Sequence, residues 1–165
     1  MVAVRGSHLL NPQDFVIEQW CAGLKLAEQT EKSLIDAWYY ARDLMSTHPD
    51  EMKNATLMLQ SGVEMVEILH ELNMDAETLL TAMLFPIVAN KLTDWESLKE
   101  KFGAKITKLL KGVLEMDNIR QLNASHSANA LQVDNVRRML LAMVDDFRCV
   151  IIKLAERITF LRDAE

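Results

Sequence analysis

The chain has 165 residues, of which 50% are hydrophobic and 25% charged, and its formal net charge is −6, the balance of an ordinary globular protein. Five Gly and three Pro are too few for the many tight turns of a β-sandwich, and a net acidic chain is not one that binds nucleic acid by broad neutralisation of phosphates. We therefore expect one compact all-α domain over residues 1–165.

Cysteine usage and the N-terminal sequence bear on the compartment. The two cysteines, Cys21 and Cys149, lie far apart and do not form the framework of a secreted domain. The N-terminus lacks a targeting signal, and no window approaches the ~18 consecutive apolar residues of a membrane span. We expect a cytoplasmic protein with reduced thiols and no membrane partner.

Helix signals follow one another along the first half of the chain. Asn11-Pro12 is typical of an N-cap followed by proline at the first helical position. A helix is predicted over residues 30–45, because apolar side chains recur there at steps of three or four: Leu34, Trp38, Ala41 and Met45. A break at residues 47–50 is predicted to end this helix. A second apolar face is predicted at residues 63–72.

The middle of the chain contains two further predicted helices. Residues 73–75, Asn-Met-Asp, supply a stop and a fresh N-cap before a buried helix at residues 79–88. The segment Thr93-Asp-Trp-Glu96 has the form of a capping box, in which the Thr hydroxyl and the Glu carboxylate each satisfy a backbone amide. Gly103 ends the helix that follows, and the helical period continues over residues 106–116.

The C-terminal third has the most regular pattern. Residues 123–129 are small and polar and predict an exposed loop. Two packed helices joined near Asp145-Asp146 are predicted after it, from two runs of apolar residues at helical spacing: Val136, Met139, Leu140, Met143 and Phe147, then Val150, Ile151, Leu154, Ile158 and Leu161. The ten Met residues are expected to fill the core, and about seven or eight helices are expected in all.

The sequence contains no evident ligand set for a hydrolytic metal. Imidazole and carboxylate groups together hold the metals that activate water, but the four His residues are isolated from one another. Neither a phosphate-binding glycine loop nor a nucleophile elbow is present.

Acidic residues near the C-terminus have two interpretations. Asp134, Asp145 and Asp146 could form a carboxylate cluster for metal or acid and base chemistry, but nearby arginines such as Arg148 favour structural ion pairs. Lys153 and Glu156, one helical turn apart, are expected to lie on a shared face.

Four segments, taken in order, resemble the N-terminal HD-type hydrolase domain of the RelA/SpoT family, whose enzymes make and break the alarmone (p)ppGpp: residues 62–69, 78–88, 136–148 and 152–157. The resemblance is strong over residues 62–162. It implies an all-α, HD-domain-like fold.

The positions that hold the metal in active hydrolases of this family are altered here. By the resemblance, Ser61 stands at the first metal His, and Phe85 and Pro86 stand at the His-Asp pair that names the fold. Glu156 matches a further metal Asp, whereas Phe160 replaces an Asn four residues later. These replacements are similar to those of RelA-type synthetases, and they imply a domain with no catalytic residue, no metal and no cofactor of its own.

The exchange at Phe85 and Pro86 also has local consequences. A Phe ring fills the space of an imidazole ligand, and Pro lacks an amide donor and clashes with the carbonyl of Ala82 if the helix continues. We predict a kink or an early end of the helix near Phe85 and a collapsed, metal-free cavity.

The resemblance implies a parent protein with GTP pyrophosphokinase activity, which transfers pyrophosphate from ATP to the 3′-hydroxyl of GTP or GDP on stalled ribosomes. That chemistry, with its Mg²⁺, would belong to an adjacent synthetase domain beyond residue 165, and ribosome contacts would belong to other regions. The present chain, expected to be an N-terminal fragment, would hold and regulate the synthetase domain.

Two other functions stay open. A phosphohydrolase with a non-standard site would need Glu156, Asp145 and Asp146 to converge in one cleft. A non-catalytic sensor of guanine nucleotides would need basic groups for the phosphates, yet residues 52–60 contain only Lys53. A homodimer through an apolar helix face is a further open alternative.

Overall fold

The computed structural model describes residues 15–47, 52–124, 134, 137, 141 and 146–163, with side chains for 15–47, 55–116, 134, 137, 141 and 146–162. Within these residues the chain forms seven α-helices and no strand, which confirms the all-α fold. The helices are α1 (Ile17–Leu24), α2 (Glu28–Ser46), α3 (Met52–Glu71), α4 (Ala76–Ala89), α5 (Trp95–Phe102), α6 (Ala104–Ala124) and α8 (Arg148–Asp163).

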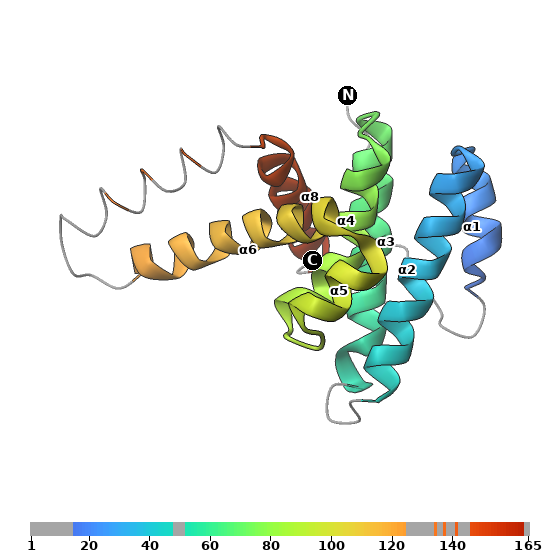
Figure 1. Cartoon of the computed structure of the whole chain (residues 1–165), viewed down its shortest axis with the longest axis horizontal. Coiled ribbons are helices and arrows are strands. Elements are labelled where there is room, and N and C mark those ends of the chain that lie inside the picture. Colours follow the sequence, from blue (N-terminus) through green and yellow to red (C-terminus); the bar gives the residue numbers. More distant parts are fainter. Residues whose placement is uncertain are drawn as a thin grey trace.

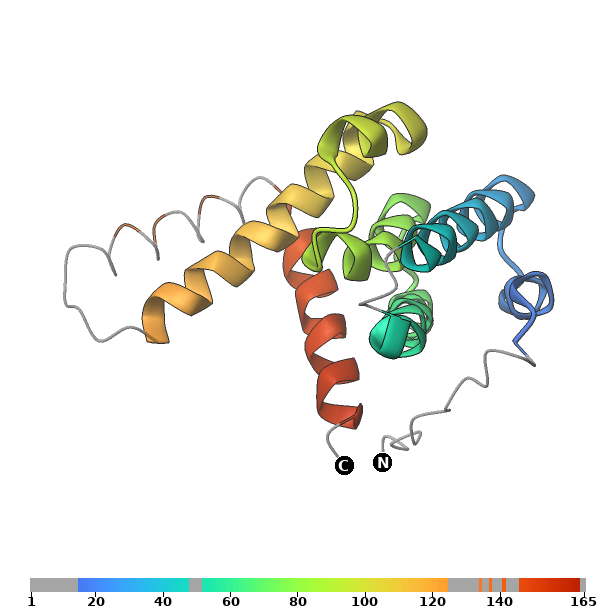
Figure 2. The same ribbon diagram turned by 90° about the horizontal axis from the view of Figure 1, so that it is seen from below.

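Helix α4 is the centre of the fold. Figure 1 shows α3 and α4 between the α1–α2 pair on one side and α6 and α8 on the other. Helix α4 packs against α2, α3, α6 and α8, and ten of its residues between Thr78 and Val88 are buried. A helix that is apolar on all sides needs such an enclosure. Figure 2 shows α6 projecting away from this core toward its C-terminal end.

The core confirms the apolar faces predicted for α2 and for most of α3. The face predicted from residues 34–45 is buried at the four positions expected, and Leu69 and Val66 of α3 are fully buried, although Leu72 is 57% exposed. Several methionines fill the core as expected: Met45, Met58, Met65 and Met83.

The stop and cap between α3 and α4 are confirmed. Asn73 adopts a φ of 55°, the left-handed conformation that Asn tolerates better than most residues. The Asp75 side chain then accepts a hydrogen bond of 2.9 Å from the backbone N–H of Thr78. This cap begins α4 where the sequence predicted a new helix.

The cap of α5 differs from the predicted one by one residue. Asp94, and not Thr93, is the N-cap, and its carboxylate accepts a hydrogen bond of 2.9 Å from the N–H of Ser97. The capping box at Thr93 is therefore wrong, because Asp caps at least as well and the Thr93 hydroxyl instead lies 2.8 Å from the hydroxyl of Tyr40. Gly103 ends α5 as predicted, with a φ of 88°.

Helix α4 continues through Pro86. It runs to Ala89 with Pro86 inside it, and the N–H of Asn90 donates to the Pro86 carbonyl at 3.2 Å. The early end predicted near Phe85 is therefore wrong, since packing on every side of α4 outweighs the ~3 kcal/mol cost of an interior proline. The predicted kink stays a prediction.

The burial predicted for the last helix is wrong on one face. Helix α8 packs on its neighbours through four residues that are at most 4% exposed: Cys149, Ile152, Ala155 and Thr159. Leu154, Ile158 and Leu161, predicted to be packed, are 55%, 41% and 57% exposed, and Phe147 before the helix is 65% exposed. Because both faces of α8 are apolar, periodicity alone could not select the packed one.

Some predictions fall outside the described residues. These are the helix start at Asn11-Pro12, the break at residues 48–50, the loop residues 125–129 and most of the helix predicted before Phe147. Asn123 and Ala124 belong to α6, so the predicted loop began two residues too early. None of the helices in the described ranges is both long and apolar enough to cross a membrane.

Candidate functional site

The residues that the family resemblance singled out come from α3, α4 and α8, three helices that pack against one another. Phe85 of α4 is 2% exposed. The Ser61 hydroxyl of α3 lies 3.4 Å from the hydroxyl of Thr159, a buried residue of α8. The structure thus packs the helices that carry Ser61, Phe85 and Glu156 directly against one another, and we call this region the α3–α4–α8 site.

Glu156 is the carboxylate of the α3–α4–α8 site, and it is already paired. Its Oε2 lies 2.8 Å from Nζ of Lys153 one turn earlier, and the two side chains are only 26% and 15% exposed. The same ammonium nitrogen lies 5.4 Å from the ring centroid of Phe85, within the range of a cation–π interaction. Lys153 therefore joins Glu156 to the ring of Phe85.

Phe160 and Pro86 do not extend this donor set. Phe160 is 57% exposed and its ring lies 5.0 Å from the Arg157 guanidinium carbon, so Thr159, and not Phe160, lies beside Ser61. Pro86 is buried, and its carbonyl accepts hydrogen bonds from both the backbone and the side chain of Asn90. The positional resemblance alone could not show that Thr159, and not Phe160, faces α3.

The donor set does not fit a hydrolytic metal. Such metals are held by several imidazole and carboxylate groups, whereas this site offers the hydroxyls of Ser61 and Thr159 and the ion-paired carboxylate of Glu156. Among the residues that the structure describes, no three His, Cys, Asp or Glu side chains are grouped as a metal would require.

A buried polar pair next to Ser61 was not predicted. Gln60 Nε2 donates to Glu64 Oε1 at 3.0 Å on α3, and the two residues are 1% and 7% exposed. Their spacing of four residues is the available sequence signal, but it is also common on helix surfaces. The pair adds polarity to the inner face of α3.

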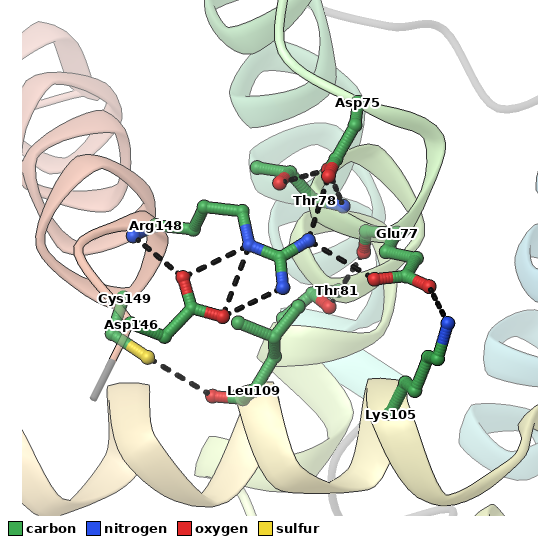
Figure 3. A network of polar contacts seen from close by, with 9 residues as sticks. All are labelled: Asp75, Glu77, Thr78, Thr81, Lys105, Leu109, Asp146, Arg148 and Cys149. Atoms are coloured by element: carbon green, nitrogen blue, oxygen red, sulfur yellow. Dashed lines mark hydrogen bonds and ion pairs between the residues drawn. The ribbon is translucent and has the colours of Figure 1, made fainter.

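A second polar cluster forms around Arg148 at the start of α8 (Figure 3). The guanidinium pairs with Asp146 at 2.6 Å, with Asp75 at 2.6 Å and with Glu77 at 3.0 Å. Lys105 of α6 pairs with Glu77 at 3.3 Å. This Arg148 cluster joins the N-terminal ends of α4 and α8 and confirms structural ion pairing for Asp146.

Interactions within the Arg148 cluster shift the pKa values of its acidic side chains. The hydrogen bond from Arg148 lowers the pKa of Asp146, despite the opposing effect of burial. Burial alone would raise the pKa of Asp75, but hydrogen bonds from Thr78 and the charge of Arg148 outweigh it, so this pKa lies below its ordinary value. The pKa of Arg148 itself is raised, chiefly by Asp146.

Of the three carboxylates required for a non-standard hydrolase site, the two that the structure describes, Asp146 and Glu156, do not converge. Asp146 belongs to the Arg148 cluster, and Glu156 lies eight residues along α8 from Arg148, about 12 Å at 1.5 Å per residue. Asp145 lies outside the described residues, and Asp134 is exposed. Lys53, the basic residue relevant to a nucleotide pocket, also has no described side chain.

A pocket of about 500 Å³ adjoins the Arg148 cluster. Its wall carries cationic and anionic side chains in near balance: Lys105, Lys108, Lys111 and Arg148 against Glu77, Glu115 and Asp146. Recognition of phosphate groups needs an excess of cationic donors, so this wall does not favour an anionic nucleotide.

Comparison with known proteins defines the class of this fold and site. Residues 37–165 match the HD domain family, and the chain belongs to that family. Within it, the resemblance to RelA-type proteins is confirmed. The chain is 98% identical over its whole length to a GTP pyrophosphokinase of Haemophilus influenzae and 48% identical to that of Escherichia coli K12, and it covers 22% of the length of each relative.

A more distant relative is named for both synthesis and hydrolysis. Over 80% of the chain, the sequence is 29% identical to the bifunctional (p)ppGpp synthase/hydrolase SpoT of Escherichia coli K12, of which it covers 18%. The chain therefore spans about a fifth of the curated relatives that it matches.

Proposed function

We propose that this chain is a catalytically inactive HD domain with a structural and regulatory role in a RelA-type GTP pyrophosphokinase. The observation that carries the proposal is the buried ring of Phe85 at the position of the family's metal His. Pro86, at the position of the Asp, offers no side-chain ligand. Phe85, at the centre of the α3–α4–α8 site, therefore belongs to the hydrophobic core.

The packing of the site supports this role. Phe85 contacts the Lys153 ammonium, which in turn neutralises Glu156. An open metal position would require several unpaired donors and room for water, and the neighbouring Ser61 and Thr159 supply hydroxyl groups only. We therefore assign this site the role of holding the three helices together, and not of catalysing a reaction.

The wider context is also part of the proposal. Pyrophosphate transfer from ATP to GTP or GDP, with its Mg²⁺, would take place in an adjacent synthetase domain, and ribosome contacts would lie elsewhere in the parent protein. The HD domain would hold the synthetase domain in an active or restrained arrangement in the cytoplasm. The GTP pyrophosphokinase relatives and their greater length support this placement.

A hydrolysis assay tests the proposal. The 165-residue chain is incubated with ppGpp and Mn²⁺, and release of 3′-pyrophosphate is measured with the bifunctional SpoT relative as positive control. We expect no release above the rate without protein. Turnover that depends on Mn²⁺ and is lost in Glu156→Gln would overturn the proposal, whereas nucleotide binding by calorimetry without turnover would favour a sensor instead.

A further inference from the structure

Helix α8 carries a second apolar stripe on the face opposite to its packed one. The stripe consists of residues separated by steps of four, three, four and three: Phe147, Ile151, Leu154, Ile158 and Leu161. Ile151 is half-buried, and the other four are between 41% and 65% exposed. We call these five residues the α8 seam.

The spacing of the α8 seam is that of a helix which packs against another helix. Steps of four and three give an average period of 3.5 residues, the repeat with which two helices interlock side by side at a shallow angle. Large apolar side chains scattered singly on a surface need no explanation. Four at this regular spacing on α8, preceded by Phe147 immediately before the helix, indicate a helical partner.

The residues that flank the α8 seam specify the charge of that partner. Arg157 and Arg162 occupy flanking positions next to Ile158 and Leu161, where charged residues of paired helices meet. No described residue forms an ion pair with either arginine. If two copies of α8 paired through this seam, their flanking arginines would face each other in both the parallel and the antiparallel orientation. The repulsion between these like charges disfavours self-pairing.

We infer that the α8 seam binds an amphipathic helix with acidic flanking residues, contributed by the part of a RelA-type polypeptide outside these 165 residues. The inference rests on the proposed function for the identity of the parent chain. It is supported by the length of the relatives, of which this chain covers 22%. Such a contact would link the partner helix physically to the α3–α4–α8 site, because α8 also carries Lys153 and Glu156 of that site.

Cysteine labelling in two proteins tests the inference. Leu154→Cys is introduced into this chain and at the equivalent position of the full-length Haemophilus influenzae relative, and modification by iodoacetamide is followed on the peptide that carries residue 154. Leu72→Cys is the matched control, since Leu72 is 57% exposed and Leu154 is 55% exposed. Native Cys21 and Cys149 are buried, and burial raises the pKa of both thiols, that of Cys21 to about 11.

We expect residue 154 to react in the 165-residue chain and to react at least about tenfold more slowly in the full-length protein, with residue 72 unaffected. Equal reactivity of residue 154 in both proteins would overturn the inference. Protection in the 165-residue chain, or protection that depends on protein concentration, would also overturn it by assigning the seam to a second copy.

The acidic character of the partner has its own test. In the full-length protein with Leu154→Cys, the double change Arg157→Glu and Arg162→Glu should raise the labelling rate roughly threefold or more, because two ion pairs become repulsive. Arg42→Glu, on the distant helix α2, is the control. An unchanged rate would refute acidic flanks. None of these rates depends on ppGpp hydrolysis, so failure here is distinguishable from failure of the proposed function.

Discussion

The ammonium nitrogen of Lys153 lies 2.8 Å from Oε2 of Glu156 and 5.4 Å from the ring centroid of Phe85. A basic side chain of the protein thereby neutralises the carboxylate that the family resemblance aligns with a metal ligand. Because both partners of the ion pair are largely buried, removal of one leaves a charge that water can only partly solvate.

Lys153→Met should therefore destabilise the domain by about 1–3 kcal/mol, measured by urea unfolding. Lys105→Met is the matched control, because Lys105 also pairs with a glutamate but its side chain is 81% exposed, and an exposed pair contributes less than about 1 kcal/mol. Equal losses for the two variants would contradict the burial of the Lys153 pair.

Phe85→Ala should cost about 3–5 kcal/mol of unfolding free energy, since it leaves a cavity in the centre of α4 packing. Phe160→Ala removes the same ring from a side chain that is 57% exposed and should cost less than about 1 kcal/mol. Chemical denaturation of both variants would check this, and a small effect at Phe85 would show that its site is open and not packed.

Arg148→Met should destabilise the domain by about 2–3 kcal/mol at neutral pH. This loss is smaller than for a fully buried ion pair, because Asp75 is half exposed and water screens its charge. The pKa values of Asp75 and Asp146 lie below the ordinary aspartate value in the folded protein. Their contribution is complete above that value and is lost as the pH falls through the lower, folded-state pKa values.

The stability difference between wild type and Arg148→Met should accordingly shrink as the pH falls below the ordinary pKa of aspartate, because the folded-state pKa values of Asp75 and Asp146 are lower. Unfolding curves at a series of pH values measure it. Arg42→Met is the control, because the ion pair of Arg42 is with the neighbouring, exposed Asp43, so this change should alter the pH dependence of stability far less. A constant difference from pH 7 to pH 2 would argue against the Arg148 cluster.

Gly112→Ala should destabilise the packing of α6 on α8. An added Cβ would lie 2.6 Å from Sγ of Cys149, so the thiol must move at a cost of about 1–3 kcal/mol. Cys149→Ala in the same chain should recover part of this loss. Gly23→Ala in α1 meets no atom within 4 Å and should stabilise the protein by about 0.5–1 kcal/mol.

Much of this architecture follows from local patterns, and the exceptions have physical causes. The cap at Asp75 and the stop at Gly103 were predictable because they depend on neighbouring residues. Pro86 inside α4 was not, since enclosure by other helices overrides the cost of a proline. The choice between the two apolar faces of α8 likewise depends on tertiary contacts.

The candidate site was predictable in composition but not in geometry. Positional resemblance identified Ser61, Phe85 and Glu156, whereas only the structure revealed Thr159 beside Ser61 and Phe160 facing outward. The partners of Arg148 on α4, seventy or more residues away in sequence, gave no local signal. Long-range ion pairs of this kind require the fold.

Direct measurement of Mn²⁺ binding is the most direct test of an inactive HD domain. Free Mn²⁺ is followed by electron paramagnetic resonance during titration into the 165-residue chain and into Glu156→Gln. We predict the same weak, non-stoichiometric uptake for both proteins. One tightly bound Mn²⁺ per chain, lost in Glu156→Gln, would contradict the assignment of Ser61, Phe85 and Glu156 to a packed core.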